Sequence, residues 1–146
     1  MRTNRSNCPL VKSLEIIGDK WSLIIIRDLF LGKKTFTEFM SSSEKFATNI
    51  LISRLNFLIQ HRLIKVIKLP HDKKTKFYYL TNKGIDLYPI LYEMMNWSKR
   101  NLDSEYGPLA TKFFDAAEKV SSKKFIRKTQ SKYIEARDAF LNVGRV

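Results

Sequence analysis

TFTEFMSSSEKFATNILISRLNFLIQHRLIKVIKLPHDKKTKFYYLT, residues 35–81, is the stretch of this chain that decides its fold. Thr35 and Glu38 form a Thr-x-x-Glu capping box, in which the two side chains satisfy free backbone amides at the start of a helix. A second helix is expected over Ala47–His61, because apolar residues recur there at helical spacing on one side. That side holds Leu51, Leu55, Leu58 and Ile59, and the opposite flank is polar.

A basic hairpin follows this second helix directly. Ile64–Leu69 and Lys76–Leu80 have the composition of strands, and Pro70–Thr75 supplies the turn between them. Two helices joined by a short turn and followed by a hairpin form the order of a winged helix-turn-helix. We therefore expect a mainly α fold (α+β), a winged helix-turn-helix domain with a two-stranded wing and a C-terminal helical extension.

The charge of the chain indicates a polyanionic partner. The 146 residues carry a formal net charge of +13, and the sequence pI is near 9.9. The excess is greatest in residues 61–84, where seven lysine and arginine residues face one acidic residue, Asp72. A solvated charged hairpin explains this segment as well as a phosphate contact does, when the segment is taken by itself.

The helices outside this stretch give the rest of the core. We expect helices at Pro9–Ile17 and Lys20–Leu31, and a long one at Thr81–Arg100 that Pro89 kinks. The last helix carries more apolar surface than one small domain needs, which favours a dimer interface over ordinary packing on the residues behind it. Its candidate interface residues are Leu91, Met94, Met95 and Trp97.

Residues 101–146 form the expected helical extension, behind a first domain at residues 8–100. Tyr106-Gly107-Pro108 interrupts the chain and opens a helix to about Val120, and a final helix is expected over Lys123–Leu141. This final helix is strongly basic, through Lys123, Lys124, Arg127, Lys128 and Lys132. We interpret it as a solvated face; the alternatives are an additional DNA contact or a site for an acidic partner.

Five short motifs now resemble a known family. They are Cys8-Pro9, Ile17-Gly18-Asp19-Lys20-Trp21, Phe36-Thr37-Glu38-Phe39, Ala47-Thr48-Asn49-x-Leu51-x-x-Arg54-Leu55 and Leu80-Thr81-x-x-Gly84. Their order and spacing are similar to those of the HxlR-type winged helix-turn-helix transcription regulators of bacteria, over residues 8 to about 100.

This resemblance implies a homodimer built through the first and last helices of the domain, which adds Leu10 and Leu14 to the interface. It implies that the second helix of the motif enters the major groove of DNA, with the wing beside it. Some members repress or activate genes through an N-terminal cysteine that senses quinones, aldehydes, disulfide stress or hypochlorite. The lysine-rich wing tip departs from the family pattern, so we expect phosphate binding there in preference to a minor-groove role.

The candidate DNA-binding residues fall into three sets. Short polar side chains near the start of a helix have the reach and the donors and acceptors that base edges require. The recognition-helix set is Thr48, Asn49, Ile52, Ser53 and Asn56, with Asn49 suited to adenine and Ile52 to a thymine methyl group. The expected phosphate contacts are Lys33, Lys34, Thr35 and Arg54, of which Arg54 has an internal carboxylate as its alternative partner. The wing set is His71, Lys73, Lys74 and Lys76.

Cys8, the one cysteine of the chain, is a candidate redox sensor. It precedes Pro9 at the start of the first helix, with Lys12 one turn on, and both the helix dipole and the ammonium group favour a reactive thiolate. Oxidation would give an intersubunit bridge, a mixed disulfide or an adduct with an electrophile. The alternative is an inert small residue at the dimer interface.

Other classes of function find little support. We find no glycine-rich phosphate loop, metal-ligand spacing or Cys/His pair, so we expect no enzyme, no cofactor and no metal site. No apolar run is long enough to span a membrane and no signal peptide is evident, so we expect a cytoplasmic protein. The expected partners are operator DNA, a second copy of the chain and an effector, either a small molecule or an oxidant. The alternative function is a winged-helix protein-interaction module without sequence-specific DNA binding.

Overall fold

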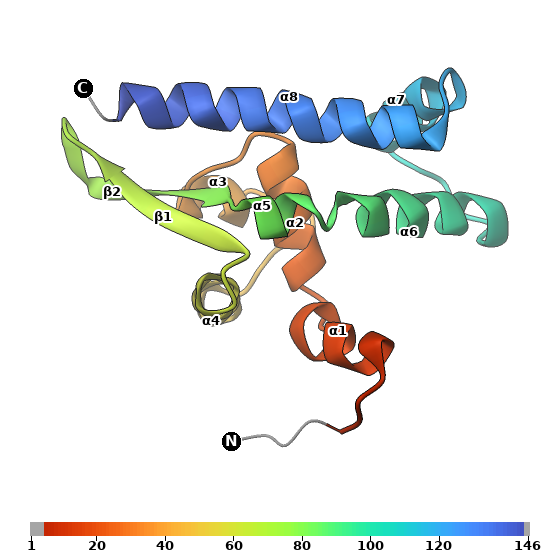
Figure 1. Cartoon of the computed structure of the whole chain (residues 1–146), viewed down its shortest axis with the longest axis horizontal. Helices are drawn as coiled ribbons and strands as arrows, with labels where there is room; N and C mark the ends of the chain where they lie inside the picture. Colours follow the sequence, from red (N-terminus) through yellow and green to blue (C-terminus); the bar gives the residue numbers. More distant parts are fainter. Residues whose placement is uncertain (1–4, 145–146) are drawn as a thin grey trace. The chain divides into compact units, whose positions relative to one another are not determined.

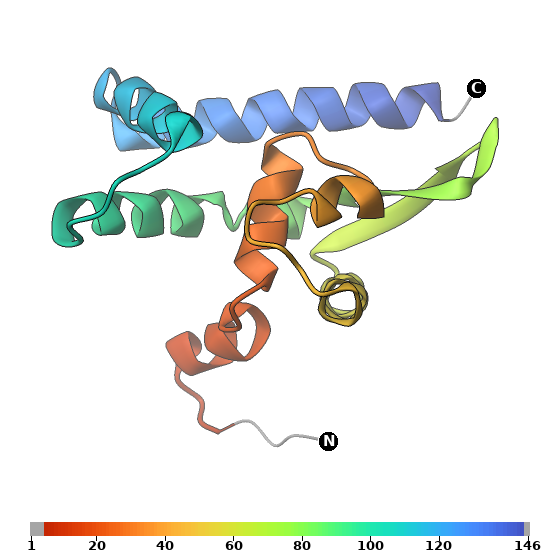
Figure 2. The ribbon, with the colours of Figure 1, turned by 180° about the vertical axis from the view of Figure 1, so that it is seen from behind.

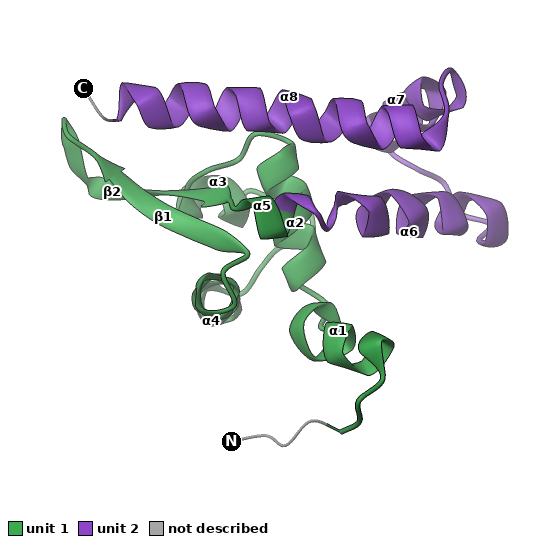
Figure 3. Cartoon of the chain, viewed as in Figure 1, with its two compact units in different colours: residues 1–84 green, residues 85–146 purple. Residues whose placement is uncertain are grey.

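The computed structural model describes residues 5–144, which divide into two compact units (Figures 1 and 3). The first unit ends at Gly84 and the second begins at Ile85, whereas the sequence predicted a boundary near residue 100. The described residues form eight helices and two antiparallel strands, which are joined by turns and loops. The predicted fold class, a winged helix-turn-helix with a C-terminal helical extension, is confirmed.

The first unit contains the helix-turn-helix motif and the wing. Its elements are α1 (Pro9–Ile17), α2 (Ser22–Phe30), α3 (Phe36–Met40), α4 (Thr48–Gln60), β1 (Ile64–Leu69) and β2 (Asp72–Leu80), and α5 (Asn82–Ile85) ends at the unit boundary. Figure 2 shows the loop that leads from α3 down to α4. In this unit α2, α3, α4, β1 and β2 supply the core side chains, because each of them has one apolar face. Those with almost no exposure are Ile25, Ile26, Leu29, Phe39, Leu51, Leu55, Leu58, Ile64 and Leu80.

The wing is an antiparallel hairpin that extends away from α4 (Figure 1). Its register pairs Ile64 with Leu80 and Ile67 with Phe77, and then shifts, so that Leu69 pairs with Asp72. The second strand therefore begins at Asp72, four residues before the predicted start, and the extra residues bulge out of the ladder. A further backbone bond, from the Tyr78 amide to the carbonyl of Lys34 at 2.8 Å, joins the hairpin to the residues before α3.

A buried carboxylate joins α2 to the loop between α3 and α4. The side chain of Asp28 is 1% exposed; one oxygen accepts hydrogen bonds from Nε and Nη2 of Arg27, at 3.1 and 2.8 Å, and the other accepts one from the Ser42 hydroxyl. Lys33 Nζ lies 3.6 Å from the second oxygen and donates to Ser42 Oγ at 3.0 Å. Because a buried charge is costly unless it is paired, these contacts favour a conformation in which the loop stays against α2.

The hairpin returns to the helices through a close backbone contact. The Thr81 hydroxyl donates to the carbonyl of Arg62 at 2.6 Å, and its oxygen accepts from the Gly84 amide at 3.2 Å. A Cβ atom at position 84 would lie 2.2 Å from the carbonyl oxygen of Leu63, so only glycine fits there. The Leu80-Thr81-x-x-Gly84 motif is thus explained by the way α5 packs on the end of α4.

The second unit is a small helical cluster with an aromatic centre. It contains α6 (Tyr88–Asn101), α7 (Pro108–Glu118) and α8 (Ser122–Val143). The rings of Tyr92, Phe113 and Phe125, one from each helix, lie 5.4–5.9 Å apart between centroids. The prediction of one long helix over residues 81–100, kinked at Pro89, is wrong, because α5 and α6 are separate helices. Pro89 instead lies in the first turn of α6, where its missing amide leaves no hydrogen bond unmade.

The pair formed by Arg27 and Glu44 should be measurable through acid sensitivity. Arg27 Nη1 and Nη2 donate to Oε1 and Oε2 of Glu44 at 2.6 and 2.9 Å, and this hydrogen bonding lowers the pKa of Glu44 from its ordinary 4.5 to about 2. The stabilisation is therefore complete above pH 4.5 and is lost as the pH falls towards 2. Near pH 7, Glu44→Gln should lower the free energy of unfolding by about 1–2 kcal/mol, the value of a charge-assisted hydrogen bond at a partly exposed site.

Urea unfolding of wild type and Glu44→Gln over a pH series measures this difference. The gap between the two proteins should narrow as the pH falls below 4.5. A gap that stays constant down to the lowest pH would show that the charge of Glu44 contributes nothing to the fold.

Candidate nucleic-acid interface

The polar flank of α4 faces away from the core. Leu51, Leu55 and Leu58 are buried on the inner side of the helix. All five predicted recognition residues, Thr48, Asn49, Ile52, Ser53 and Asn56, are exposed on the other side. The side chain of Ile52 is 48% exposed among polar neighbours. An apolar residue exposed in such a setting could contact the methyl group of thymine.

The residues that lead into α4 add a cation that the sequence analysis did not single out. Lys45 is exposed and has a positive φ of 55°, which is unusual for a residue other than glycine. It precedes α4, whose N-cap residue, Ala47, provides no side-chain hydrogen bond. Its position in the turn just before the expected recognition helix is the sequence signal that could have identified Lys45 as a candidate.

The two predicted phosphate-binding lysines in the segment before α3 have different partners. The ammonium group of Lys33 is directed at Asp28 and Ser42 inside the first unit, whereas Lys34 Nζ donates to the Gly32 carbonyl at 3.2 Å on the exposed side. Thr35 forms the predicted capping box, because its hydroxyl accepts from the Glu38 amide and Glu38 Oε1 accepts from the Thr35 amide, both at 3.2 Å. Lys34 and Thr35 are therefore better placed than Lys33 to contact a partner at the surface.

Arg54 is also engaged within the protein. Its Nη1 lies 3.4 Å from Oδ2 of Asp19, and its guanidinium carbon lies 4.4 Å from the centre of the Phe57 ring. Asp19 Oδ1 in turn accepts from the amides of Trp21 and Ser22, both at 2.8 Å. Burial by itself raises the pKa of Asp19, but these bonds and the Ser22 hydroxyl lower it below its ordinary value. The contacts match the internal-carboxylate alternative for Arg54.

The wing presents a group of exposed cations. The predicted residues His71, Lys73, Lys74 and Lys76 are all exposed, and Lys65 and Lys68 of β1 add to them. The Asp72 carboxylate accepts from the amides of Lys74 and Thr75 at 3.2 and 3.0 Å, and the Thr75 hydrogen bonds lower the pKa of Asp72. The single acid of the hairpin is thus occupied with the backbone of the turn, and within residues 5–144 the wing lysines form no ion pair.

The remaining predicted residues lie on α1 and α6. Cys8 is an exposed free thiol at the N-cap of α1. On the same helix Leu10 and Leu14 are exposed. On α6 Met94 and Trp97 are exposed, Met95 is half-buried, and Leu91 is only 7% exposed and so has little surface to offer a partner.

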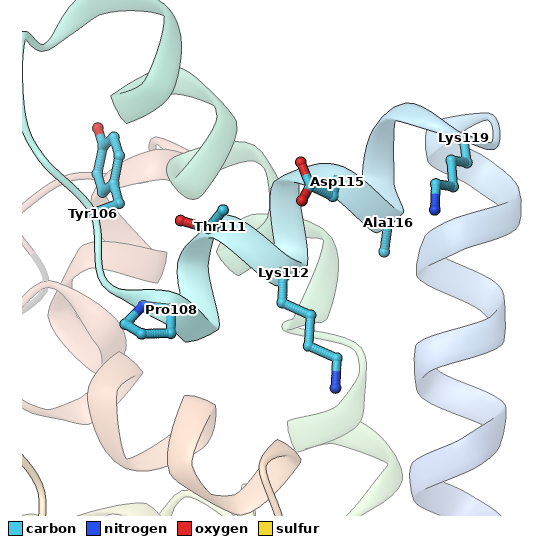
Figure 4. A pocket seen from close by; sticks show the side chains of 7 residues that line it. All are labelled: Tyr106, Pro108, Thr111, Lys112, Asp115, Ala116 and Lys119. Carbon is cyan, nitrogen blue, oxygen red and sulfur yellow. The ribbon is translucent and has the colours of Figure 1, made fainter.

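Other kinds of site are not apparent in the described part of the chain. Among residues 5–144 no group of three or more His, Cys, Asp or Glu side chains could hold a metal ion, and no helix in that range is long and apolar enough to cross a bilayer. An open depression lies along α7, lined by Tyr106, Thr111, Asp115 and their neighbours (Figure 4). None of the residues expected to contact DNA lines it.

Comparison with known proteins identifies relatives for most of the chain. The family model described as HxlR-like helix-turn-helix matches residues 16–106. The HTH-type transcriptional regulator YybR of Bacillus subtilis is 32% identical over 105 residues, which are 68% of this chain and 80% of YybR. The HTH-type transcriptional regulator Mb3122 of Mycobacterium bovis is 29% identical over 97 residues, 66% of this chain. The match spans only 61% of the length of Mb3122.

Solved structures agree with this result. The reduced form of the transcriptional regulator YodB from B. subtilis superposes with a TM-score of 0.57 at 27% identity, covering 69% of this chain and 100% of that chain. YodB has also been solved after diamide treatment and with quinone bound, and these forms superpose with TM-scores of 0.53 and 0.52.

The position of Arg54 leads to a prediction that separates its two roles. Arg54→Gln removes the contacts to Asp19 and Phe57, so it should lower the free energy of unfolding by about 1 kcal/mol. The salt dependence of DNA binding should stay the same, because an internal guanidinium releases no counterion from DNA. A slope that falls by about one unit, with unchanged stability, would instead assign Arg54 to a phosphate. Chemical denaturation and binding titrations in increasing salt measure the two quantities.

Proposed function

Because this chain belongs to the HxlR-like helix-turn-helix family of transcription regulators, we propose that it binds duplex DNA sequence-specifically as a homodimer and thereby regulates transcription. The observation that carries this proposal is the exposed flank of α4. The five side chains of the recognition-helix set take no part in the core there and face solvent. The match to the family shows the fold and the class of protein; the roles of single residues in reading DNA belong to this proposal.

Base recognition is assigned to the flank of α4. Asn49 can form a bidentate pair with adenine through N6 and N7, and Ile52 can contact the thymine methyl group of a neighbouring base pair. Thr48, Ser53 and Asn56 supply hydroxyl and amide groups within reach of the same groove. A helix presented in this way in a helix-turn-helix enters the major groove.

Contacts to the phosphate backbone of DNA are assigned to residues outside α4. Lys34 and Thr35 lie before α3, and His71, Lys73, Lys74 and Lys76 lie on the wing. Lys45, next to the start of α4, joins this set. We assign Lys33 and Arg54 a positioning role, since the first is directed at Asp28 and the second at Asp19. Phosphate contacts of this kind fix the register of the protein on DNA and carry no sequence information.

Dimer formation is supported by apolar side chains that the single chain leaves in solvent. Leu10 and Leu14 are 65% and 46% exposed on α1, and Met94 and Trp97 are 56% and 54% exposed on α6. Large exposed apolar residues on a helix favour burial against a second copy. On α6, Met95 is half-buried beside Met94, and Leu91 is buried in the second unit. A two-fold dimer would read two half-sites of a palindromic operator.

Regulation by oxidation is assigned to Cys8. The thiol is exposed at the N-cap of α1, the helix that also carries Leu10 and Leu14, so a modified thiol would lie beside the proposed interface. The relative YodB has been solved in diamide-treated and quinone-bound forms, which supports thiol chemistry within the family. The effector we propose is therefore an oxidant or an electrophilic small molecule. We further propose that the protein acts in the cytoplasm, where bacterial DNA lies, without enzymatic activity.

The specificity of binding tests the role of Asn49. Asn49→Ala should weaken binding to DNA from upstream of the protein's own gene about 10- to 100-fold and leave binding to random duplex unchanged, because a lost bidentate base contact costs about 1–3 kcal/mol. Lys74→Gln is the matched control, and it should weaken binding to both duplexes equally. Gel-shift titrations with the two duplexes provide the ratio. If wild type does not prefer the upstream DNA to random duplex, the regulator proposal fails.

The response to oxidants tests the role of Cys8. Diamide or a quinone should change the affinity of wild type for DNA by tenfold or more, about 1.4 kcal/mol, and leave Cys8→Ser unaffected. Diamide takes two electrons from a pair of thiols, so an intersubunit bridge would run as a dimer on a non-reducing gel, and reductant should restore both the monomer band and the DNA affinity. An equal response of wild type and Cys8→Ser would remove Cys8 from the mechanism.

A further inference from the structure

The first half of α8 carries a dense set of positive charges. Five cations are exposed there, Lys123, Lys124, Arg127, Lys128 and Lys132, and no acidic residue occurs between Ser121 and Ile134. Within residues 5–144 none of the five forms an ion pair. With 3.6 residues per turn, all five fall on one half of the helix circumference, which we call the basic face of α8.

The opposite face of α8 is fixed by the core of the second unit. The Phe125 ring lies 5.4 Å from that of Phe113 and 5.7 Å from that of Tyr92, measured between centroids. Five residues further on, Gln130 Nε2 donates to the carbonyl of Ile85 at 3.1 Å. Because these contacts hold one side of the helix against α6 and α7, the basic face of α8 is presented to solvent in a defined orientation.

The charges do not help the helix to form. Lys123 and Lys124 lie in the first turn, where the positive end of the helix dipole disfavours cations. Arg127 follows Lys123 by four residues, and Lys128 stands four residues from both Lys124 and Lys132. Each such like-charge pair costs about 0.2–0.5 kcal/mol. A solvated helix face normally alternates acids and bases, so this arrangement is better explained by an anionic partner than by solubility.

We propose that the basic face of α8 is a second contact for the phosphate backbone of DNA, apart from the α4 and wing surfaces; this rests on the proposed function as a DNA-binding regulator. The face contains no aromatic side chain of the kind that anchors protein partners. Between Ser121 and Lys132 the basic face also carries no apolar side chain that could enter a lipid surface. Evenly spaced cations without apolar anchors suit a polyanion.

The spacing of the cations agrees with this assignment. A rise of 1.5 Å per residue places successive members of Lys124, Lys128 and Lys132 about 6 Å apart, and the three span about 12 Å. One DNA strand presents a phosphate about every 3.4 Å along the helix axis, so about three or four phosphates lie within that span. The face lies outside residues 16–106, the part that matches the family model, and is therefore a feature of this chain's C-terminal extension.

The salt dependence of DNA binding tests the proposal with the full chain. Dissociation constants for random duplex and for the upstream duplex are measured over a salt series for wild type and for Lys124→Gln/Lys128→Gln. Each lost phosphate contact lowers the slope by about 0.9, so the double variant should lose about 1.8 units, and adding Lys132→Gln should remove about 0.9 more. The preference for upstream over random duplex should stay the same, since phosphates carry no sequence information.

A matched control separates a local contact from a change in net charge. Lys112→Gln/Lys119→Gln removes two exposed charges in the same unit, one on α7 and one at its C-cap, and its slope should equal that of wild type. The α8 variant should fold at least as stably as wild type, because like-charge pairs are relieved, so weaker binding would not reflect unfolding. Equal slopes for the α8 and α7 variants would overturn the proposal. Random duplex reports on the basic face of α8 even if the upstream DNA proves not to be an operator.

Discussion

The arrangement of the helix-turn-helix depends on the buried carboxylate of Asp28. Its two oxygens are satisfied by Arg27 and Ser42, and Lys33 lies beside them. A buried charge that lost these partners would cost several kcal/mol, so the loop that carries Ser42 has to stay against α2. Arg27 continues the network to Glu44, three residues before the N-cap of α4. The turn between α3 and α4 is thereby held at two residues, Ser42 by Asp28 and Glu44 by Arg27. The orientation of the exposed flank of α4 follows from these two contacts.

The elements whose signals are local could be predicted from the sequence. The Thr35–Glu38 box marks the start of α3, and the spacing of Leu51, Leu55 and Leu58 selects the inner face of α4, because both signals act within one or two helical turns. The motifs that carry the family resemblance prove to be joints between elements. Asp19 accepts hydrogen bonds from the amides of Trp21 and Ser22 at the start of α2 and contacts Arg54 of α4. Gly84 admits the carbonyl of Leu63 where the hairpin meets α5.

The features that depend on distant residues could not be predicted. Lys33 and Lys34 are adjacent cations in the sequence, and only the position of Asp28 directs the first into the protein. Pro89 is compatible with a kinked helix or with a new helix start, and the sequence alone does not decide between them. The orientation of the cations on α8 became clear only when Phe125 and Gln130 showed which side of that helix is packed.

The central claim is that the flank of α4 around Asn49 touches DNA bases, and amide chemical shifts measured by NMR test it most directly. On titration with the upstream duplex, the amides of residues 48–56 should show the largest changes, whereas random duplex should mainly perturb the wing and the basic face of α8. Such a pattern would assign base recognition to α4. Shifts of α4 that are equally small with both duplexes, with the largest changes elsewhere, would contradict the claim.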